Sequence, residues 1–206
     1  MLKIGLTGGI ASGKSTVAAM LRARGCHVLE MDPIGHELLQ RDAAAYAEVT
    51  REFGREILDS GGSVDRNKLG AIVFADRSKR ERLNAILHPK ILERVREWFS
   101  QRQLNGADFA VVEAALIYEA GYNTQLDRTV VCWCRQGQQI ERLERRGLTR
   151  DQAQARINAQ MPIDDKRNLA DDVIDCSKSI EDTNRQTAEL IDKLKRLAAS
   201  GNISRT

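Results

Sequence analysis

Short apolar runs alternate with longer amphipathic segments along most of this 206-residue chain. Each run is about the length of a buried strand, and the segments between them place apolar residues at helical spacing. Strands that alternate with helices predict an α/β fold with a parallel sheet, here of five strands. The five runs are KIGLT (3–7), CHVLEMD (26–32), FAVVEAALIYE (109–119), RTVVCWC (128–134) and DDVIDC (171–176).

The stretch from Pro33 to Asn105 departs from this alternation. It shows no obvious strand and reads as a helical insertion after the second strand. Its longest helical pattern contains His88 followed by Pro89, and a residue before proline is disfavoured in helical geometry. We expect His88 either to leave the helix and face a cleft or to mark a kink by which the helix wraps the core. The amphipathic segments are EVTREFG (48–54), DRNKLGAIVF (65–74) and KRERLNAILHPKILERVREWF (79–99).

A glycine-rich turn follows the first predicted strand and precedes a helix that Gly25 is expected to end. Gly8, Gly13, Lys14 and Ser15 match the pattern GxxxxGK[ST] of a phosphate-binding loop. Missing side chains let backbone N–H groups surround an anion, and the helix N-terminus adds partial positive charge. We therefore predict a nucleoside-triphosphate site in which Lys14 reaches the terminal phosphates and the Ser15 hydroxyl ligates Mg²⁺.

Two acidic residues in the apolar runs are candidates for further roles at that site. Asp32 is predicted to end the second strand, and the carboxyl ends of neighbouring parallel strands share one crevice. A carboxylate there can accept a proton from an attacking hydroxyl, although an aspartate that merely begins a helix is the alternative. Glu113 lies inside a buried run and needs a partner. That partner is either Mg²⁺ with its water shell or a basic side chain.

An arginine-rich, polar segment between the fourth and fifth predicted strands is typical of a lid. Guanidinium groups match phosphate oxygens, and closure of such a segment excludes water that would otherwise hydrolyse the donor. Most of these side chains are expected to be solvated helix surface. The candidates to contact donor phosphates are Arg142, Arg146, Arg156 and Lys166.

Charge and hydrophobicity limit the kinds of partner and the cellular location that we expect for this chain. Its formal charge is only +3, with 32 basic residues interleaved among 29 acidic ones, so we expect no nucleic-acid and no membrane surface. No run approaches about 20 apolar residues, and MLKIGLTGG lacks the features of a secretory signal, which together favour a cytoplasmic location. The cysteines have no metal-ligand spacing and read as reduced core residues, and residues 198–206 read as a frayed tail.

Several motifs resemble the dephospho-coenzyme A kinase family in order and spacing, over about residues 2 to 195. The loop variant with Thr7, Gly8 and Gly9, together with the later His-Pro pair, is far more specific than a phosphate loop alone. The matching features are GLTGGIASGKSTVA (5–18), Asp32, FG (53–54), DRNKLGAIVF (65–74), HP (88–89), ALIYEAG (115–121), RLERRGL (142–148), RINAQM (156–161) and ADDVID (170–175).

This resemblance implies a P-loop three-layer fold and transfer of the γ-phosphoryl group of ATP, with Mg²⁺, to the ribose 3′-hydroxyl of dephospho-coenzyme A. It implies a nucleotide-binding core (1–32, 106–140 and 169–206), a helical acceptor domain (33–105) and a lid (141–168). The catalytic residues carried over are Asp32 as the base, Lys14, Arg142 and Arg146. ATP would be held by Gly8, Gly9, Ile10, Ala11, Ser12, Gly13, Lys14, Ser15 and Thr16, and the acceptor would be near Asp32, Arg66, His88, Leu116 and Glu119.

Two positions depart from the family pattern. Ala115 replaces a usual proline, so the turn that faces the acceptor is expected to be looser. Cys176 replaces a usual asparagine, and a thiol is a much poorer hydrogen-bonding group than an amide. A related kinase acting on a nucleoside or another small molecule is the alternative enzyme, and we expect a monomer or a weak homo-oligomer. A guanine-dependent switch is disfavoured because no NKxD motif is present.

Overall fold

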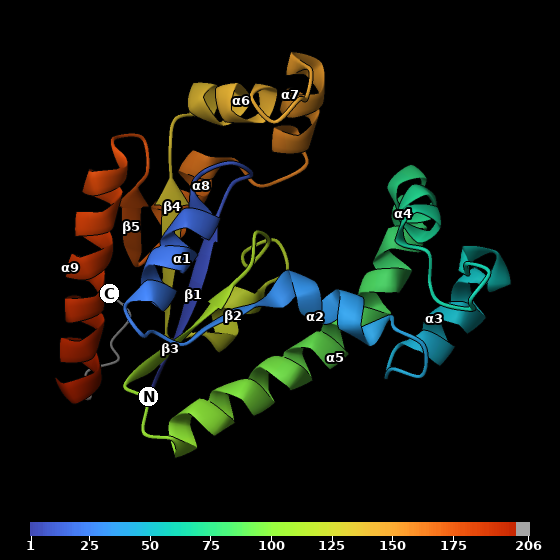
Figure 1. The fold of residues 1–206 in the computed structure, drawn as a ribbon, viewed down its shortest axis with the longest axis horizontal. Helices are drawn as coiled ribbons and strands as arrows, with labels where there is room; N and C mark the ends of the chain where they lie inside the picture. The colour runs from blue at the N-terminus through green and yellow to red at the C-terminus, as the bar shows by residue number, and fades with distance from the viewer. Residues whose placement is uncertain (201–206) are drawn as a thin grey trace. The chain divides into compact units, whose positions relative to one another are not determined.

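The computed structural model describes residues 1–200, and these residues form two compact units (Figure 1). One unit consists of residues 1–29 together with the chain from residue 101 onward, and the other consists of residues 30–100. Of the tail that the sequence predicts at 198–206, residues 201–206 lie outside the described residues, and residues 198–200 form the last part of helix α9, which ends at Ser200. No helix within residues 1–200 is both long enough and apolar enough to cross a membrane.

The first unit contains the predicted five-stranded parallel sheet, counted over the described residues, in the order β2-β3-β1-β4-β5. In the β1 ladders, Leu6 is opposite Glu113 on one side and Val130 on the other. Non-consecutive neighbours require helical crossovers, which the amphipathic segments supply. The strands are β1 (Leu2–Gly8), β2 (Val28–Glu30), β3 (Phe109–Glu113), β4 (Arg128–Trp133) and β5 (Asp172–Asp175).

Helices α1 and α9 lie side by side against the sheet (Figure 1). Their apolar faces bury Val17, Leu21, Ile191 and Leu194 against strand residues such as Leu6 in one continuous core. This packing holds the start of α1 close to the end of β1. The glycine-rich turn joins these two ends. The helical elements of this unit are α1 (Lys14–Ala23), η2 (Tyr122–Gln125), α6 (Gln136–Glu144), α7 (Arg150–Asn158), α8 (Ile163–Leu169) and α9 (Ile180–Ser200).

The second unit is helical, as its sequence predicts. Asp65 caps α4 by accepting hydrogen bonds from the backbone N–H groups of Asn67 and Lys68, at 2.8 and 3.3 Å. An isolated antiparallel bridge joins Leu58 to Val64. The elements are α2 (Met31–Leu38), α3 (Tyr46–Phe53), η1 (Arg55–Ile57), α4 (Arg66–Ala75) and α5 (Arg77–Leu104), the last of which ends in the first unit.

One local expectation is wrong, and one of the two alternatives for His88 is not observed. Strand β2 ends at Glu30, so Asp32 lies in the first turn of α2 instead of ending the strand. A proline and an acid both suit a first turn, since its N–H groups lack helical partners and carry partial positive charge. His88 does not leave the helix, because α5 continues through His88 and Pro89. Leu83 precedes His88 and Pro89 in α5, Val95 follows them, and both are buried. Their burial favours a continuous helix, although a residue before proline is disfavoured in helical geometry.

Candidate active site

The loop from Gly8 to Gly13 has no room for side chains at its two ends. A Cβ on Gly8 would lie 2.7 Å from the backbone oxygen of Cys132. A Cβ on Gly13 would lie 2.9 Å from the Cβ of Cys176, and Gly13 has a φ of +107° that other residues rarely adopt. The glycines of the phosphate-loop pattern are therefore required by close packing on the ends of β4 and β5.

Side chains from outside the loop hold its middle. The Ile10 N–H donates to Gln160 Oε1 at 2.8 Å, and Gln139 Nε2 donates to the Ile10 carbonyl at 2.7 Å. A guanidinium nitrogen of Arg142 donates to the carbonyl of Ala11 at 3.0 Å. Ala11 has a φ of +58°, a strained value for a residue with a side chain. These contacts keep the loop in one shape.

The loop leads into the start of α1, where the first backbone N–H groups of the helix have no side-chain cap among residues 1–200. The first turn of this helix contains no acidic residue. The first N–H groups of a helix lack internal partners, and together with the helix dipole they form an anion site. A cavity of about 330 Å³ opens here, lined by residues 9–16 with Ala115, Arg146 and Gln160. This combination suits a polyphosphate.

Lys14 and Glu113 form an ion pair beside the loop. Lys14 Nζ lies 2.6 Å from Glu113 Oε1, and the Glu113 side chain is only 5% exposed. Arg22 approaches the other oxygen, Oε2, at 3.6 Å. Of the two partners that the sequence allowed for Glu113, the structure shows the basic side chain.

Ser15 and Glu113 offer oxygen atoms of the kind that Mg²⁺ binds. Glu113 Oε2 is buried and has no hydrogen-bond partner among the described residues, and Ser15 lies exposed in the first turn of α1. No group of three or more His, Cys, Asp or Glu side chains within residues 1–200 could hold a metal ion. Mg²⁺ commonly uses one or two protein oxygens and takes its other ligands from phosphates and water. Ser15 and Glu113 fit that limited role.

A second cavity of about 230 Å³ adjoins the other side of the loop. Ala11, Gly13 and Thr16 line it from the loop side, and Arg142 and Arg146 line it from α6 and the turn that follows. The wall is completed by five residues that follow β5, namely Cys176, Lys178, Ser179, Ile180 and Thr183. Arg146 lines both cavities, so its side chain is placed where a nucleotide spanning them would carry its phosphates.

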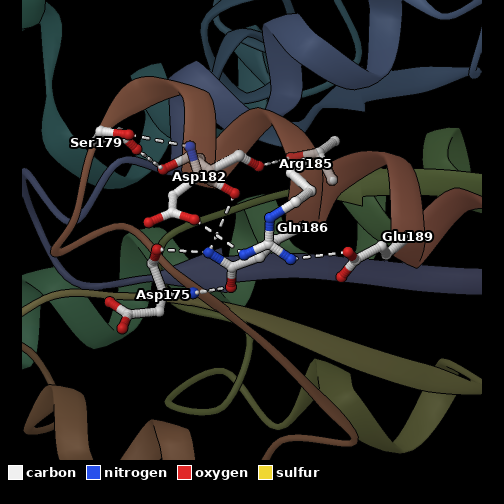
Figure 2. A network of polar contacts seen from close by, with 8 residues as sticks. Asp175, Ser179, Asp182, Arg185, Gln186 and Glu189 are labelled. Atoms are coloured by element: carbon white, nitrogen blue, oxygen red, sulfur yellow. Dashed lines mark hydrogen bonds and ion pairs between the residues drawn. The ribbon is translucent and has the colours of Figure 1, made fainter.

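A polar network fixes the end of β5 beside this second cavity (Figure 2). Gln186 on α9 binds both backbone groups of Asp175, accepting from its N–H at 2.9 Å and donating to its carbonyl at 3.0 Å. Ser179 Oγ accepts from the N–H of Asp182, near the start of α9. Arg185 bridges Asp182 and Glu189 on the outer side of the network. The amide of Gln186 thus holds the residue immediately before Cys176.

The four basic lid candidates have different surroundings. Arg142 is tied to backbone, since its second guanidinium nitrogen donates to the Cys176 carbonyl at 2.7 Å. Arg156 is exposed on α7. Lys166 is fully buried, where burial lowers its pKa, and it donates to the Ala115 carbonyl at 2.6 Å and pairs with Glu119 at 2.8 Å. Lys166 is therefore placed to support the turn after β3, a position that the sequence did not reveal.

The remaining predicted acceptor residues are divided between the units. Asp32, Arg66 and His88 are exposed on α2, α4 and α5 of the second unit. Leu116 and Glu119 follow β3 in the first unit, where Leu116 is 47% exposed and Glu119 also accepts from the N–H of Met161. Roles for these five residues stay predictions.

Comparison with known proteins agrees with this geometry. The family model described as dephospho-CoA kinase matches residues 2–182. A dephospho-CoA kinase of Carboxydothermus hydrogenoformans is 42% identical over 193 residues, which cover 93% of this chain and 94% of that protein.

Two solved structures extend the agreement to the fold. A crystal structure of a Thermus thermophilus protein has a TM-score of 0.81 at 33% identity, covering 94% of this chain and 97% of that one. The dephospho-CoA kinase from Campylobacter jejuni has a TM-score of 0.72 at 26% identity with the same coverage. A family match over most of the chain, relatives at this identity and a phosphate loop of this construction lead to one conclusion: the chain belongs to the dephospho-CoA kinase family.

Proposed function

We propose that this protein transfers the γ-phosphoryl group of ATP to the ribose 3′-hydroxyl of dephospho-CoA, giving CoA and ADP in the last step of CoA biosynthesis. The observation that carries the proposal is the uncapped start of α1 behind a glycine loop held by Gln139, Arg142 and Gln160. Such a loop presents its backbone N–H groups to phosphates in a shape that is already fixed. The identity of the acceptor, dephospho-CoA, is inferred from the family to which the chain belongs.

On the donor side, the N–H groups at the start of α1 bind the phosphates of ATP. Lys14 exchanges its bond to Glu113 for the terminal phosphate oxygens, where it neutralises charge that develops during transfer. Arg146, which lines both cavities, also binds a phosphate group of ATP. Arg142 positions the loop through its bonds to Ala11 and Cys176.

On the acceptor side, Asp32 takes the proton of the 3′-hydroxyl as the hydroxyl oxygen attacks the γ-phosphorus. A new phosphorus–oxygen bond forms, the bond to the bridging oxygen of ADP breaks, and ADP leaves with the electron pair. Arg66 and His88 bind the acceptor within the helical domain at 33–105, and Leu116 and Glu119 contribute from the turn after β3. The segment 141–168 acts as a lid that excludes water.

Ser15 and Glu113 are the residues that would hold Mg²⁺. Bound there, the ion would neutralise negative charge on the phosphate groups of ATP. Ser15 would contribute its hydroxyl oxygen, and Glu113 would contribute the carboxylate oxygen that lacks a hydrogen-bond partner among residues 1–200. A cytoplasmic location and a monomeric or weakly oligomeric state stay predictions.

A coupled assay of ADP release with Mg·ATP tests the proposal. Dephospho-CoA is the acceptor, and adenosine, AMP and shikimate are control acceptors. We expect one ADP for each CoA formed and no turnover with the controls. Turnover with adenosine or shikimate would instead support the alternative of a related small-molecule or nucleoside kinase, and ATP binding without transfer would overturn the kinase assignment.

A further inference from the structure

Lys166 is a buried charge that the proposed chemistry does not use. It lies on α8, which contacts β4, and its side chain is fully buried. Trp133 at the end of β4 holds this helix: its indole Nε1 donates to Asp164 Oδ1 at 2.7 Å, and the guanidinium of Arg167 lies 4.7 Å from the centre of its ring. A buried charge is costly unless it is paired, so the partners of Lys166 indicate its role.

The first partner is the carbonyl of Ala115, where the chain leaves β3. Lys166 Nζ donates to this oxygen at 2.6 Å, and Thr7 Oγ1, near the end of β1, donates to it at 3.1 Å. The N–H of the preceding residue, Ala114, donates to the carbonyl of Leu6 on β1 at 3.1 Å. The two side chains therefore extend the contact between β1 and β3 by one residue. Ala115 lines the cavity at the phosphate loop, so Lys166 holds part of that wall in place.

The second partner is Glu119, which neutralises the buried ammonium. Its Oε1 lies 2.8 Å from Lys166 Nζ, and the Glu119 side chain is 23% exposed. The same oxygen accepts from the N–H of Met161 at 2.9 Å. Burial lowers the pKa of Lys166 and the bond to Glu119 opposes that shift, so the carboxylate helps to keep the ammonium charged. Glu119 thus bonds to Lys166 and to the backbone between α7 and α8.

The segment between α7 and α8 also reaches the phosphate loop. Gln160 accepts from the N–H of Ile10 at 2.8 Å and lines the same cavity as Ala115. Residues 160–166 are therefore bonded both to the loop that is proposed to bind ATP and to the turn at 115–119 that is proposed to face the acceptor. A change in these bonds would shift the turn relative to the loop.

We propose that Lys166 is a positioning residue for phosphoryl transfer: its ammonium fixes the turn at 115–119 relative to the phosphate loop, so that acceptor and donor phosphates meet in one geometry. This inference rests on the proposed function. Glu119 acts through Lys166, and Leu116, which is 47% exposed on the same turn, contacts the acceptor. A displacement of about 1 Å between reacting groups lowers turnover by up to roughly a hundredfold. Loss of the ammonium should therefore affect turnover more than ATP affinity.

The first test replaces Lys166 with Met in the full-length protein, which keeps a long side chain and removes its charge and its donors. We expect kcat with dephospho-CoA to fall about 10–100-fold and KM for this acceptor to rise. The Kd of a non-hydrolysable ATP analogue should stay nearly constant, because Gln139 and Arg142 still hold the loop. Lys195→Met is the matched control at an exposed lysine of α9, and it should change none of these quantities.

A double variant separates positioning from stability. Lys166→Met leaves the Glu119 carboxylate without its counter-ion, which should lower Tm by roughly 10 °C. Adding Glu119→Gln removes the unpaired charge and keeps an acceptor for the N–H of Met161, so most of the lost stability should return. Turnover should stay low, because the Ala115 carbonyl still lacks the ammonium. Turnover that recovers together with Tm would overturn the positioning role, and so would an unchanged kcat in both variants.

Amide hydrogen exchange supplies a readout that needs no phosphoryl transfer. The N–H groups of Ala120, Gly121 and Tyr122 each donate at 2.9 Å to carbonyls earlier in the turn. In the double variant they should exchange about tenfold faster, whereas peptides from residues 8–16 should keep their rates. Unchanged exchange in the turn would overturn the inference. A wild type that releases no ADP with dephospho-CoA would overturn the proposed function instead, and the exchange rates would still decide whether Lys166 holds the turn.

Discussion

The two units present their candidate residues in different ways. In the first unit, Ile10 and Ala11 of the loop are held by Gln139, Arg142 and Gln160, and all three contacts are partly buried. In the second unit, Asp32, Arg66 and His88 are exposed on separate helices. A donor site assembled by packing cannot lose a residue without losing stability or affinity. A group exposed on a helix can lose its function and leave the fold intact.

The largest expected effect tests the second unit. Replacing Asp32 with Asn should lower kcat by about 10²–10⁴-fold, the usual contribution of a positioned base, and leave ATP affinity nearly unchanged. Steady-state kinetics with dephospho-CoA and a separate nucleotide titration measure the two quantities. An equal loss of ATP affinity and turnover would show that Asp32 belongs to the donor site, and the contrast between the units would fail.

The next prediction tests the packed loop of the first unit. Gly13→Ala should cost about 2–4 kcal/mol of unfolding free energy, because it combines strain at positive φ with a clash against Cys176. Gly25→Ala is the matched control, since Gly25 has a φ of +77° but no atom within 4 Å of its added Cβ. The control should lose only about 1–2 kcal/mol and keep its ATP affinity. Denaturant unfolding and nucleotide titration check both variants, and equal losses would remove the close-packing argument.

A smaller effect tests the network of Figure 2. Gln186→Leu leaves both backbone groups of Asp175 without their amide partner, which should cost about 1–3 kcal/mol and weaken nucleotide binding at the second cavity. Arg185→Ala changes the adjacent residue of the same network, but its partners are on the surface and stability should hardly change. Similar losses in the two variants would mean that the inner amide has no special role.

The smallest expected effect is a pH dependence inside the first unit. Because the pKa of Cys176 is lowered below 9.0, its thiolate persists at lower pH than in the unfolded chain, and alkylation should follow a midpoint below 9. Alkylation of Cys134 should follow a midpoint near 11. Peptide mapping after short pulses of alkylating reagent measures both. Arg142→Gln should move the Cys176 midpoint upward, and an unchanged midpoint would exclude the guanidinium as a cause.

The sheet and the phosphate loop could be predicted from residues that lie close together in the sequence. Five apolar runs predicted the five strands, and a glycine pattern between a strand and a helix predicted the phosphate loop, because both depend on residues near one another in the chain. A local signal failed at Asp32, which lies in a suitable first turn of a helix instead of at the end of a strand, and the signal at His88 left open whether the helix continues. Gln139 offered only a weak signal, a polar residue beside apolar Ile140 on the buried face of an amphipathic helix.

By itself, the sequence determined the fold class, the phosphate loop and the kinase family, since these follow from periodicity, spacing and motif order. Only the tertiary structure decided which side chains hold the loop, that Lys14 pairs with Glu113, that Lys166 is buried beneath Ala115, and that Cys176 touches Gly13. Each of these contacts joins segments more than fifty residues apart, up to more than a hundred and fifty. Such pairs produce no pattern along the sequence. Their residues come together only when the chain folds and buries its core.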